Sequence, residues 1–106
     1  MTYPLPEKFP EQFTVLINAV KQYNSNYAAD LPLLYKAYRY AEEAHKEQYR
    51  QSGEPYFQHL YHTALILAEL NMDTATICAG LLHDILEDTN ISEEIIINEF
   101  SPQIVQ

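Results

Sequence analysis

Residues 80–89 read GLLHDILEDT and combine one histidine and three carboxylates with four aliphatic side chains. At about 100° per residue of an α-helix, the polar side chains share one arc and the aliphatic ones share the opposite arc. The polar set is His83, Asp84, Glu87 and Asp88. Gly80 falls in the middle of the polar arc, where a missing side chain would leave room for an ion or a ligand. The segment therefore predicts an amphipathic helix.

This polar arc has two interpretations. A charged face opposite an apolar stripe is the normal form of a surface helix, and for the segment alone this is the simpler interpretation. Adjacent His83 and Asp84 can also offer an imidazole nitrogen and a carboxylate oxygen to one divalent cation. That donor mixture suits Mn²⁺, Fe²⁺ or Zn²⁺ better than Ca²⁺. Two residues cannot hold a metal, so a further ligand has to come from elsewhere in the chain.

The other histidines are His45, His59 and His62. His59 lies at a spacing from His83 that fits two antiparallel helices meeting at one end. It is the candidate third ligand. For His45 and His62 we favour the structural role of a histidine whose hydrogen bonds are satisfied within the fold.

Apolar residues recur at helical spacing in several stretches, and strand-like alternation is nearly absent. The first predicted helix follows Pro10 and buries Phe13, Leu16, Ile17 and Val20. The second has Asp30 as its N-cap and Pro32 in its first turn. Its inward face carries Leu34, Ala37, Tyr38, Ala41, Ala44 and Gln48.

A polar loop, RQSGEP at residues 50–55, separates this helix from the next. The third helix is predicted over residues 56–70, with Leu60, Ala64, Leu67 and Leu70 facing inward. Asp73 caps a fourth helix that ends near Thr89, Ser92 caps a short fifth, and Ser101-Pro102 begins a sixth. We expect an all-α helical bundle of about five helices plus the start of a sixth, and therefore an incomplete domain.

Composition and charge restrict the function classes. The chain has 106 residues, a net charge of −9 and one cysteine, Cys78, which we expect to be a buried thiol. All six basic residues lie in the first 50 positions, and nine acids with no base follow. Such a surface repels phosphate backbones, which argues against DNA binding, and attracts cations. No apolar run reaches the ~18 residues of a membrane span, and the first residues, MTYPLPEKFPEQF, lack the basic patch and apolar core of a signal peptide. We expect a cytoplasmic protein.

The runs AHKEQYRQSGEPYFQHL and AELNMDTATICAGLLHDILEDT, followed by an acidic segment ending at Phe100, resemble the N-terminal HD hydrolase domain of the RelA/SpoT family. These bacterial enzymes make and degrade the alarmone (p)ppGpp in the stringent response. The resemblance covers about residues 36–106. It divides the chain into an N-terminal helical segment over residues 1–30, with no assigned role, and part of an HD domain over residues 31–106.

The resemblance implies roles for eight residues. His59, His83 and Asp84 match Mn²⁺ ligands, and Glu87 and Asp88 match the acidic pair that orients and activates the attacking water. Arg50, Gln51 and Ser52 match the loop that contacts the guanosine nucleotide. The implied reaction is hydrolysis of the 3′-diphosphate, giving GDP or GTP and pyrophosphate. Tyr49 and Tyr56 are interpreted as packing residues.

The chain departs from the family at three points. Gln51 stands where lysine or arginine is common, and Leu60 stands where proline is usual. The aspartate that completes the metal shell in the family comes from a later helix, beyond Gln106. We therefore expect little activity from these 106 residues alone. The alternatives are a non-catalytic regulatory or interaction module of a synthetase, and an inactive fragment whose exposed apolar faces drive self-association.

Overall fold

The computed structural model describes residues 3–85, which form four α-helices. They are α1 (Glu11–Lys21), α2 (Tyr27–Ala44), α3 (Tyr56–Glu69) and α4 (Thr74–Leu82). No strand occurs within residues 3–85, so the all-α prediction is confirmed for that range. The expected helices after Ser92 and Ser101 lie outside it. None of the four helices combines the length and the apolar character that crossing a bilayer requires.

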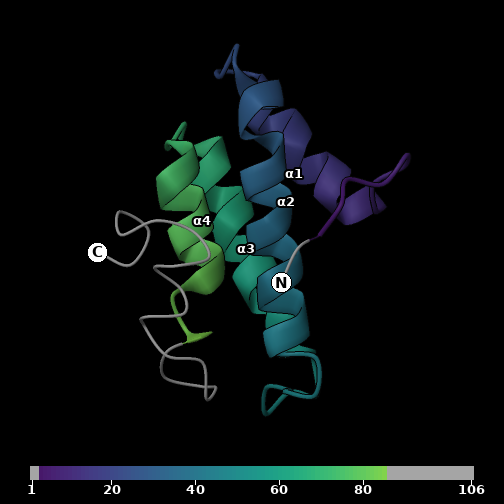
Figure 1. Ribbon diagram of the computed structural model, residues 1–106. Helices are drawn as coiled ribbons and strands as arrows, with labels where there is room; N and C mark the ends of the chain where they lie inside the picture. The colour runs from purple at the N-terminus through teal and green to yellow at the C-terminus, as the bar shows by residue number, and fades with distance from the viewer. Residues whose placement is uncertain (1–2, 86–106) are drawn as a thin grey trace.

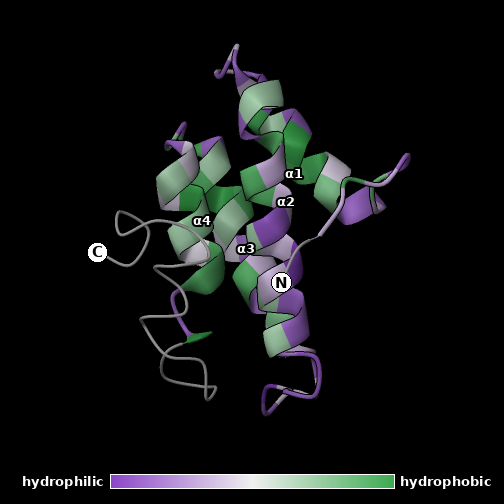
Figure 2. Cartoon of the chain, in the orientation of Figure 1, coloured by the Kyte–Doolittle hydropathy of each residue, from purple (hydrophilic) through white to green (hydrophobic). Residues whose placement is uncertain are grey.

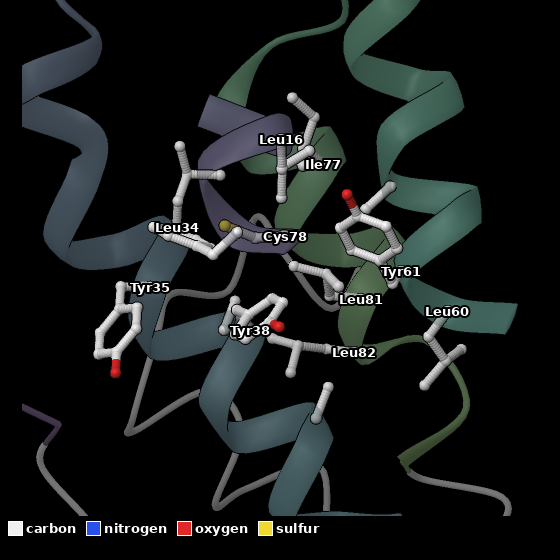
Figure 3. Close-up of a cluster of buried hydrophobic side chains, with 14 of the residues drawn as sticks. Leu16, Leu34, Tyr35, Tyr38, Leu60, Tyr61, Ile77, Cys78, Leu81 and Leu82 are labelled. Carbon is white, nitrogen blue, oxygen red and sulfur yellow. The ribbon is translucent and has the colours of Figure 1, made fainter. Parts of the chain in front are cut away.

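Helices α2, α3 and α4 alternate in direction, and α1 packs against α2 and α3 (Figure 1). All four helices contribute to one core. Figure 3 shows side chains from this cluster of buried residues, among them Leu16, Leu34, Leu60 and Leu81, one from each helix. Apolar residues gather where the helices face one another, whereas the connections at both ends of the bundle are polar (Figure 2). Because α1 belongs to this core, residues 11–21 pack with the helices that follow them.

The sequence placed the inward faces of the first two helices correctly. Phe13, Leu16, Ile17 and Val20 are buried on α1, as are Leu34, Ala37, Tyr38 and Ala41 on α2. The predicted cap of α2 is wrong, because the N-cap position is occupied by Asn26, four residues before Asp30. Asp30 instead lies in the first turn and accepts hydrogen bonds from Asn24 (3.0 Å) and Thr74 (2.7 Å). Pro32 consequently lies inside the helix, past its first turn.

Two helix ends also differ from the prediction. α2 ends at Ala44, so Gln48 lies in the following loop and not on the helix. α3 ends at Glu69, and Asn71 adopts a positive φ of 61° that turns the chain toward α4. Leu70 stands at this corner and is exposed, so its predicted inward position is wrong. Helical periodicity does not report where the chain leaves the helix.

Helix α4 begins as predicted, because the Asp73 carboxylate accepts a hydrogen bond from the Thr76 amide at 2.8 Å. Hydrogen bonds from Thr76 also lower the pKa of the Asp73 carboxyl group. α4 ends at Leu82 with His83 as its C-cap, earlier than predicted, and the expected end near Thr89 lies outside the described residues. The His83 ring binds the Gly80 carbonyl, the group that would accept the Asp84 amide in a continuing helix.

Gly80 faces α3, and the space beside it is filled. A Cβ atom at Gly80 would stand 2.7 Å from Cδ1 of Leu67 and 3.8 Å from Cγ2 of Thr63. The missing side chain therefore lets α4 approach α3 closely. The interpretation that Gly80 leaves room for an ion is wrong, although Leu81, Leu82 and Ile85 are buried on the opposite face as predicted.

Candidate functional site

A hairpin between α2 and α3 holds the residues expected to contact a nucleotide. The Arg50 amide donates to the Glu54 carbonyl at 2.9 Å, and the Gly53 amide donates to the Arg50 carbonyl at 2.8 Å. At its base the Tyr56 amide donates to the Gln48 carbonyl at 2.9 Å. Gly53 has a φ of +90°, a conformation that glycine adopts without steric cost. The predicted polar loop is therefore an ordered hairpin.

This hairpin borders an open cleft of about 650 Å³. The cleft is lined by Gln48, Tyr49, Arg50, Gln51, Ser52, Glu54 and Tyr56. Arg50, Gln51 and Ser52 are all exposed, so their side chains are available to a ligand. Tyr49 is 62% exposed, so its predicted packing role is wrong. The volume lies within the range of pockets that bind small molecules.

His83 and Asp84 lie side by side directly after α4, at the end of the bundle that carries the hairpin (Figure 1). Nε2 of His83 is 3.1 Å from Oδ1 of Asp84. The His83 side chain is 47% exposed, whereas that of Asp84 is 15% exposed. The histidine is therefore open to solvent beside a largely buried carboxylate.

Both ring nitrogens of His83 face hydrogen-bond acceptors. Nδ1 lies 2.7 Å from the Gly80 carbonyl oxygen, which can only accept, so Nδ1 carries a hydrogen. Nε2 then faces a carboxylate oxygen, and this contact is favourable only with a proton or a cation at Nε2. A carbonyl bound to the other ring nitrogen is also the usual support of a metal-ligating histidine. The nitrogen and oxygen donors of this pair therefore fit a divalent transition metal ion.

The second oxygen of Asp84 is held by a residue that the sequence interpretation assigned to packing. The Tyr56 hydroxyl donates to Oδ2 of Asp84 at 2.5 Å. The Tyr56 ring contacts the rings of His45 (centroids 5.2 Å apart) and His59 (5.8 Å). Tyr56 thus joins the cleft to the Asp84 carboxylate. Its position three residues before His59 on α3 was the signal in the sequence, because residues so spaced share a helix face.

The predicted ligands are only partly brought together. His59 is half-buried near the start of α3 and contacts Tyr56, whose hydroxyl reaches Asp84. Within residues 3–85 no group of three or more histidine, cysteine, aspartate or glutamate side chains is arranged to hold a metal ion. The described part of the site is a pair, His83 and Asp84, with His59 linked to it through Tyr56. Glu87 and Asp88 lie outside the described residues.

The two remaining histidines differ from each other. His45 is buried at 1% exposure, and its Nδ1 donates to the Gln48 side-chain oxygen at 2.8 Å. Its Nε2 has no hydrogen-bond partner among the described residues, so the prediction of a satisfied histidine holds for one nitrogen. His62 is exposed on α3, where its ring contacts the Tyr61 ring, and its predicted structural role stays a prediction.

Comparison with known proteins gives one family. A family model described as HD domain matches residues 37–106. A probable guanosine-3′,5′-bis(diphosphate) 3′-pyrophosphohydrolase of Mycoplasma genitalium is 51% identical over 78 residues, which are 74% of this chain and 11% of the relative. The bifunctional (p)ppGpp synthase/hydrolase RelA of Mycobacterium tuberculosis is 56% identical over 61 residues, 58% of this chain and 8% of the relative.

A GTP pyrophosphokinase of Myxococcus xanthus is 40% identical over 99 residues, 93% of this chain and 12% of the relative. The chain thus spans about a tenth of the length of the curated relatives it matches. The HD domain model covers more than half of the chain, and the relatives confirm the resemblance to the RelA/SpoT type. This chain therefore belongs to the HD domain family.

Proposed function

We propose that the chain is part of a metal-dependent (p)ppGpp 3′-pyrophosphohydrolase, which releases pyrophosphate from guanosine 3′,5′-bis(diphosphate) and leaves GDP or GTP. The observation that carries the proposal is the pairing of His83 with Asp84. Their 3.1 Å contact presents two metal-type donors at the end of the bundle that carries the cleft. The names of the relatives from Mycoplasma genitalium and Mycobacterium tuberculosis support the choice of substrate.

The proposed metal ligands are His59, His83 and Asp84, and the proposed ion is Mn²⁺. A divalent ion would neutralise phosphoryl charge and lower the pKa of a water molecule beside the phosphorus. His83 is suited to this role because the Gly80 carbonyl fixes the hydrogen on Nδ1 and leaves Nε2 for the ion. Asp84 is suited because its largely buried carboxylate is already directed at Nε2.

The proposed nucleotide contacts are Arg50, Gln51 and Ser52 in the cleft. The planar guanidinium of Arg50 can stack on a guanine base, and the Ser52 hydroxyl and Gln51 amide can bind polar groups of the sugar or phosphates. Arg50 is the cation among the residues that line this cleft. A highly anionic substrate would therefore depend on the metal ion for most of its charge neutralisation.

Glu87 and Asp88 are the proposed residues that orient and deprotonate the attacking water. Their carboxylates follow the ligand pair by three and four positions in the sequence. A positioned carboxylate contributes to hydrolysis by taking the proton as the water attacks. The proposed setting for this reaction is the bacterial cytoplasm.

A second candidate is a non-catalytic regulatory module of a (p)ppGpp synthetase. The relative from Myxococcus xanthus, which covers 93% of this chain, is named a GTP pyrophosphokinase. The described residues also form no three-ligand metal cluster. The retained His83-Asp84 and Glu87-Asp88 pairs favour the hydrolase, because a module without catalysis has no need of them.

Product analysis separates the two candidates. The full-length protein is incubated with ppGpp and Mn²⁺, and the products are resolved by anion-exchange chromatography. If the protein is the hydrolase, we expect GDP and pyrophosphate in equal amounts. We expect neither product from an Asp84→Asn variant. Intact ppGpp in the presence of bound Mn²⁺ would favour the regulatory module. Release of inorganic phosphate in place of pyrophosphate would contradict the proposed bond cleavage.

A further inference from the structure

The side chain of Tyr56 connects three parts of the site. Its backbone is fixed at the base of the hairpin by the hydrogen bond to the Gln48 carbonyl. Its ring contacts His45 and His59, and its hydroxyl donates to Asp84. We infer that Tyr56 is a positioning residue, which fixes the Asp84 carboxylate for metal binding through its hydroxyl group. This inference rests on the proposed function.

The ring of Tyr56 has a rigid support. His45 is almost fully buried, and its Nδ1 is bound to the Gln48 side chain at 2.8 Å. The rings of His45 and Tyr56 lie at an angle of 32° with their centroids 5.2 Å apart. Gln48 therefore holds Tyr56 twice, through its carbonyl to the Tyr56 amide and through His45 to the Tyr56 ring. A tyrosine held in this way delivers its hydroxyl to one place.

The hydroxyl fixes which carboxylate oxygen is available to an ion. At 2.5 Å the contact between the Tyr56 hydroxyl and Oδ2 of Asp84 has the length of a charge-assisted hydrogen bond. With Oδ2 occupied, Oδ1 remains directed toward Nε2 of His83, 3.1 Å away. Without the hydroxyl the carboxylate could rotate about its last bond, and the ion would have to fix it on binding. Hydrogen-bond partners of metal ligands typically change metal affinity by about 10- to 100-fold.

The chain provides a matched control for the loss of a tyrosine hydroxyl. Tyr61 lies on the same helix, and its hydroxyl donates to the Gln12 carbonyl on α1 at 2.7 Å. Tyr61 is buried, and its hydrogen bond joins α3 to α1 within the core. Tyr61→Phe and Tyr56→Phe therefore each remove one hydroxyl from α3 and keep the aromatic ring. Only the second change removes a partner of a proposed ligand.

The test measures Mn²⁺ binding to the full-length protein by the electron paramagnetic resonance signal of free Mn²⁺. Circular dichroism gives the thermal midpoint of the metal-free protein. We expect Tyr56→Phe to weaken Mn²⁺ binding about 10- to 100-fold, with a thermal midpoint no lower than that of Tyr61→Phe. Tyr61→Phe should bind Mn²⁺ as the unaltered protein does.

Three results would overturn the inference, and they separate it from the proposed function. If the unaltered protein binds Mn²⁺ and hydrolyses ppGpp but Tyr56→Phe binds the ion equally well, the positioning role alone fails. If both tyrosine variants weaken Mn²⁺ binding to the same extent, the weaker binding comes from a less stable fold, and the positioning role again fails. If the unaltered protein binds no Mn²⁺, the proposed function fails first and the inference fails with it.

Discussion

His83 and Asp84 present Nε2 and Oδ1 to each other at 3.1 Å, directly beyond the last residue of α4. The arrangement follows from the end of the helix. The His83 ring turns back to the Gly80 carbonyl through Nδ1, and this leaves Nε2 beside the carboxylate. The Asp84 carboxylate is in turn held from its other side by Tyr56. His83 is thus oriented by the Gly80 carbonyl, and Asp84 is oriented by the Tyr56 hydroxyl.

Replacing either member of the pair should remove Mn²⁺ binding from the full-length protein. His83→Ala and Asp84→Ala each delete one donor, and we expect the affinity to fall by at least about 100-fold, more than for the loss of a supporting hydrogen bond. The His83 side chain is half exposed, so His83→Ala should leave the helical content unchanged. His62→Ala is the matched control, because His62 is also exposed but lies on α3 beside Tyr61. Equal losses in His62→Ala and His83→Ala would contradict the assignment.

The charge of the hairpin should affect substrate affinity through Gln51. Gln51→Lys places a second cation beside the cleft, and an exposed charge pair contributes up to about 1 kcal/mol. We therefore expect the KM for ppGpp to fall about 2- to 5-fold with little change in kcat. Gln51→Glu should have the opposite effect and raise the KM for ppGpp. Both effects should shrink as salt is raised to about 1 M, where the screening length is about 3 Å. Equal KM values for the two variants would contradict a nucleotide contact here.

The Cys78 thiol should resist chemical modification in the folded protein. Burial, with smaller contributions from Asp30 and Asp73, raises its pKa from 9.0 to about 12. At pH 8 the thiolate fraction is then about a thousandfold lower than for an unfolded cysteine. We expect reaction with a disulfide reagent only after unfolding. Rapid labelling of the native protein would contradict the buried position.

The same pKa shift implies a dependence of stability on pH. The folded protein keeps the Cys78 proton more tightly than the unfolded chain does, since the shift is upward. Its contribution to stability is therefore complete below pH 9 and declines as the pH rises toward 12. Cys78→Ser should weaken this alkaline decline. Urea unfolding between pH 8 and pH 11 measures the difference.

The tertiary role of Asp30 can be tested with Thr74. The 2.7 Å hydrogen bond between them joins α2 to the first residue of α4. A hydrogen bond to a charged group contributes about 1.5–3 kcal/mol, and partial exposure places this one toward the lower value. We expect Asp30→Ala and Thr74→Ala to be non-additive in urea unfolding, with a coupling energy near 1 kcal/mol. Additive losses would indicate that Asp30 acts only within its own helix turn.

Sequence patterns predicted the features of this protein that depend on local order. The buried faces of α1 and α2, the Asp73 cap and the polar hairpin follow from helical periodicity, capping preferences and breaker residues. The paired donors His83 and Asp84 could be identified because they are adjacent. The family of the chain followed from the order of its motifs, and the HD domain match over residues 37–106 confirms it.

The features that the sequence did not reveal depend on partners from distant segments. Aspartate is a residue type that often caps helices, but the Asp30 carboxylate accepts a hydrogen bond from Thr74, far along the chain. In the sequence Tyr56 resembles a packing residue. In the structure its hydroxyl donates to Asp84, which follows a different helix, α4. Gly80 gives no sign in the sequence that a Leu67 methyl group fills the space beside it. These contacts are determined by how the helices pack together, and helical periodicity in the sequence does not show which helices pack together.

The most direct test of the proposed hydrolase is a titration of metal-free full-length protein with Mn²⁺, in which pyrophosphate release from ppGpp is measured. We expect no release after treatment with a chelator, and release that rises with Mn²⁺ and saturates. The same titration of His83→Ala should stay at the baseline. Pyrophosphate release that persists in the chelator, or its absence at saturating Mn²⁺, would contradict the account.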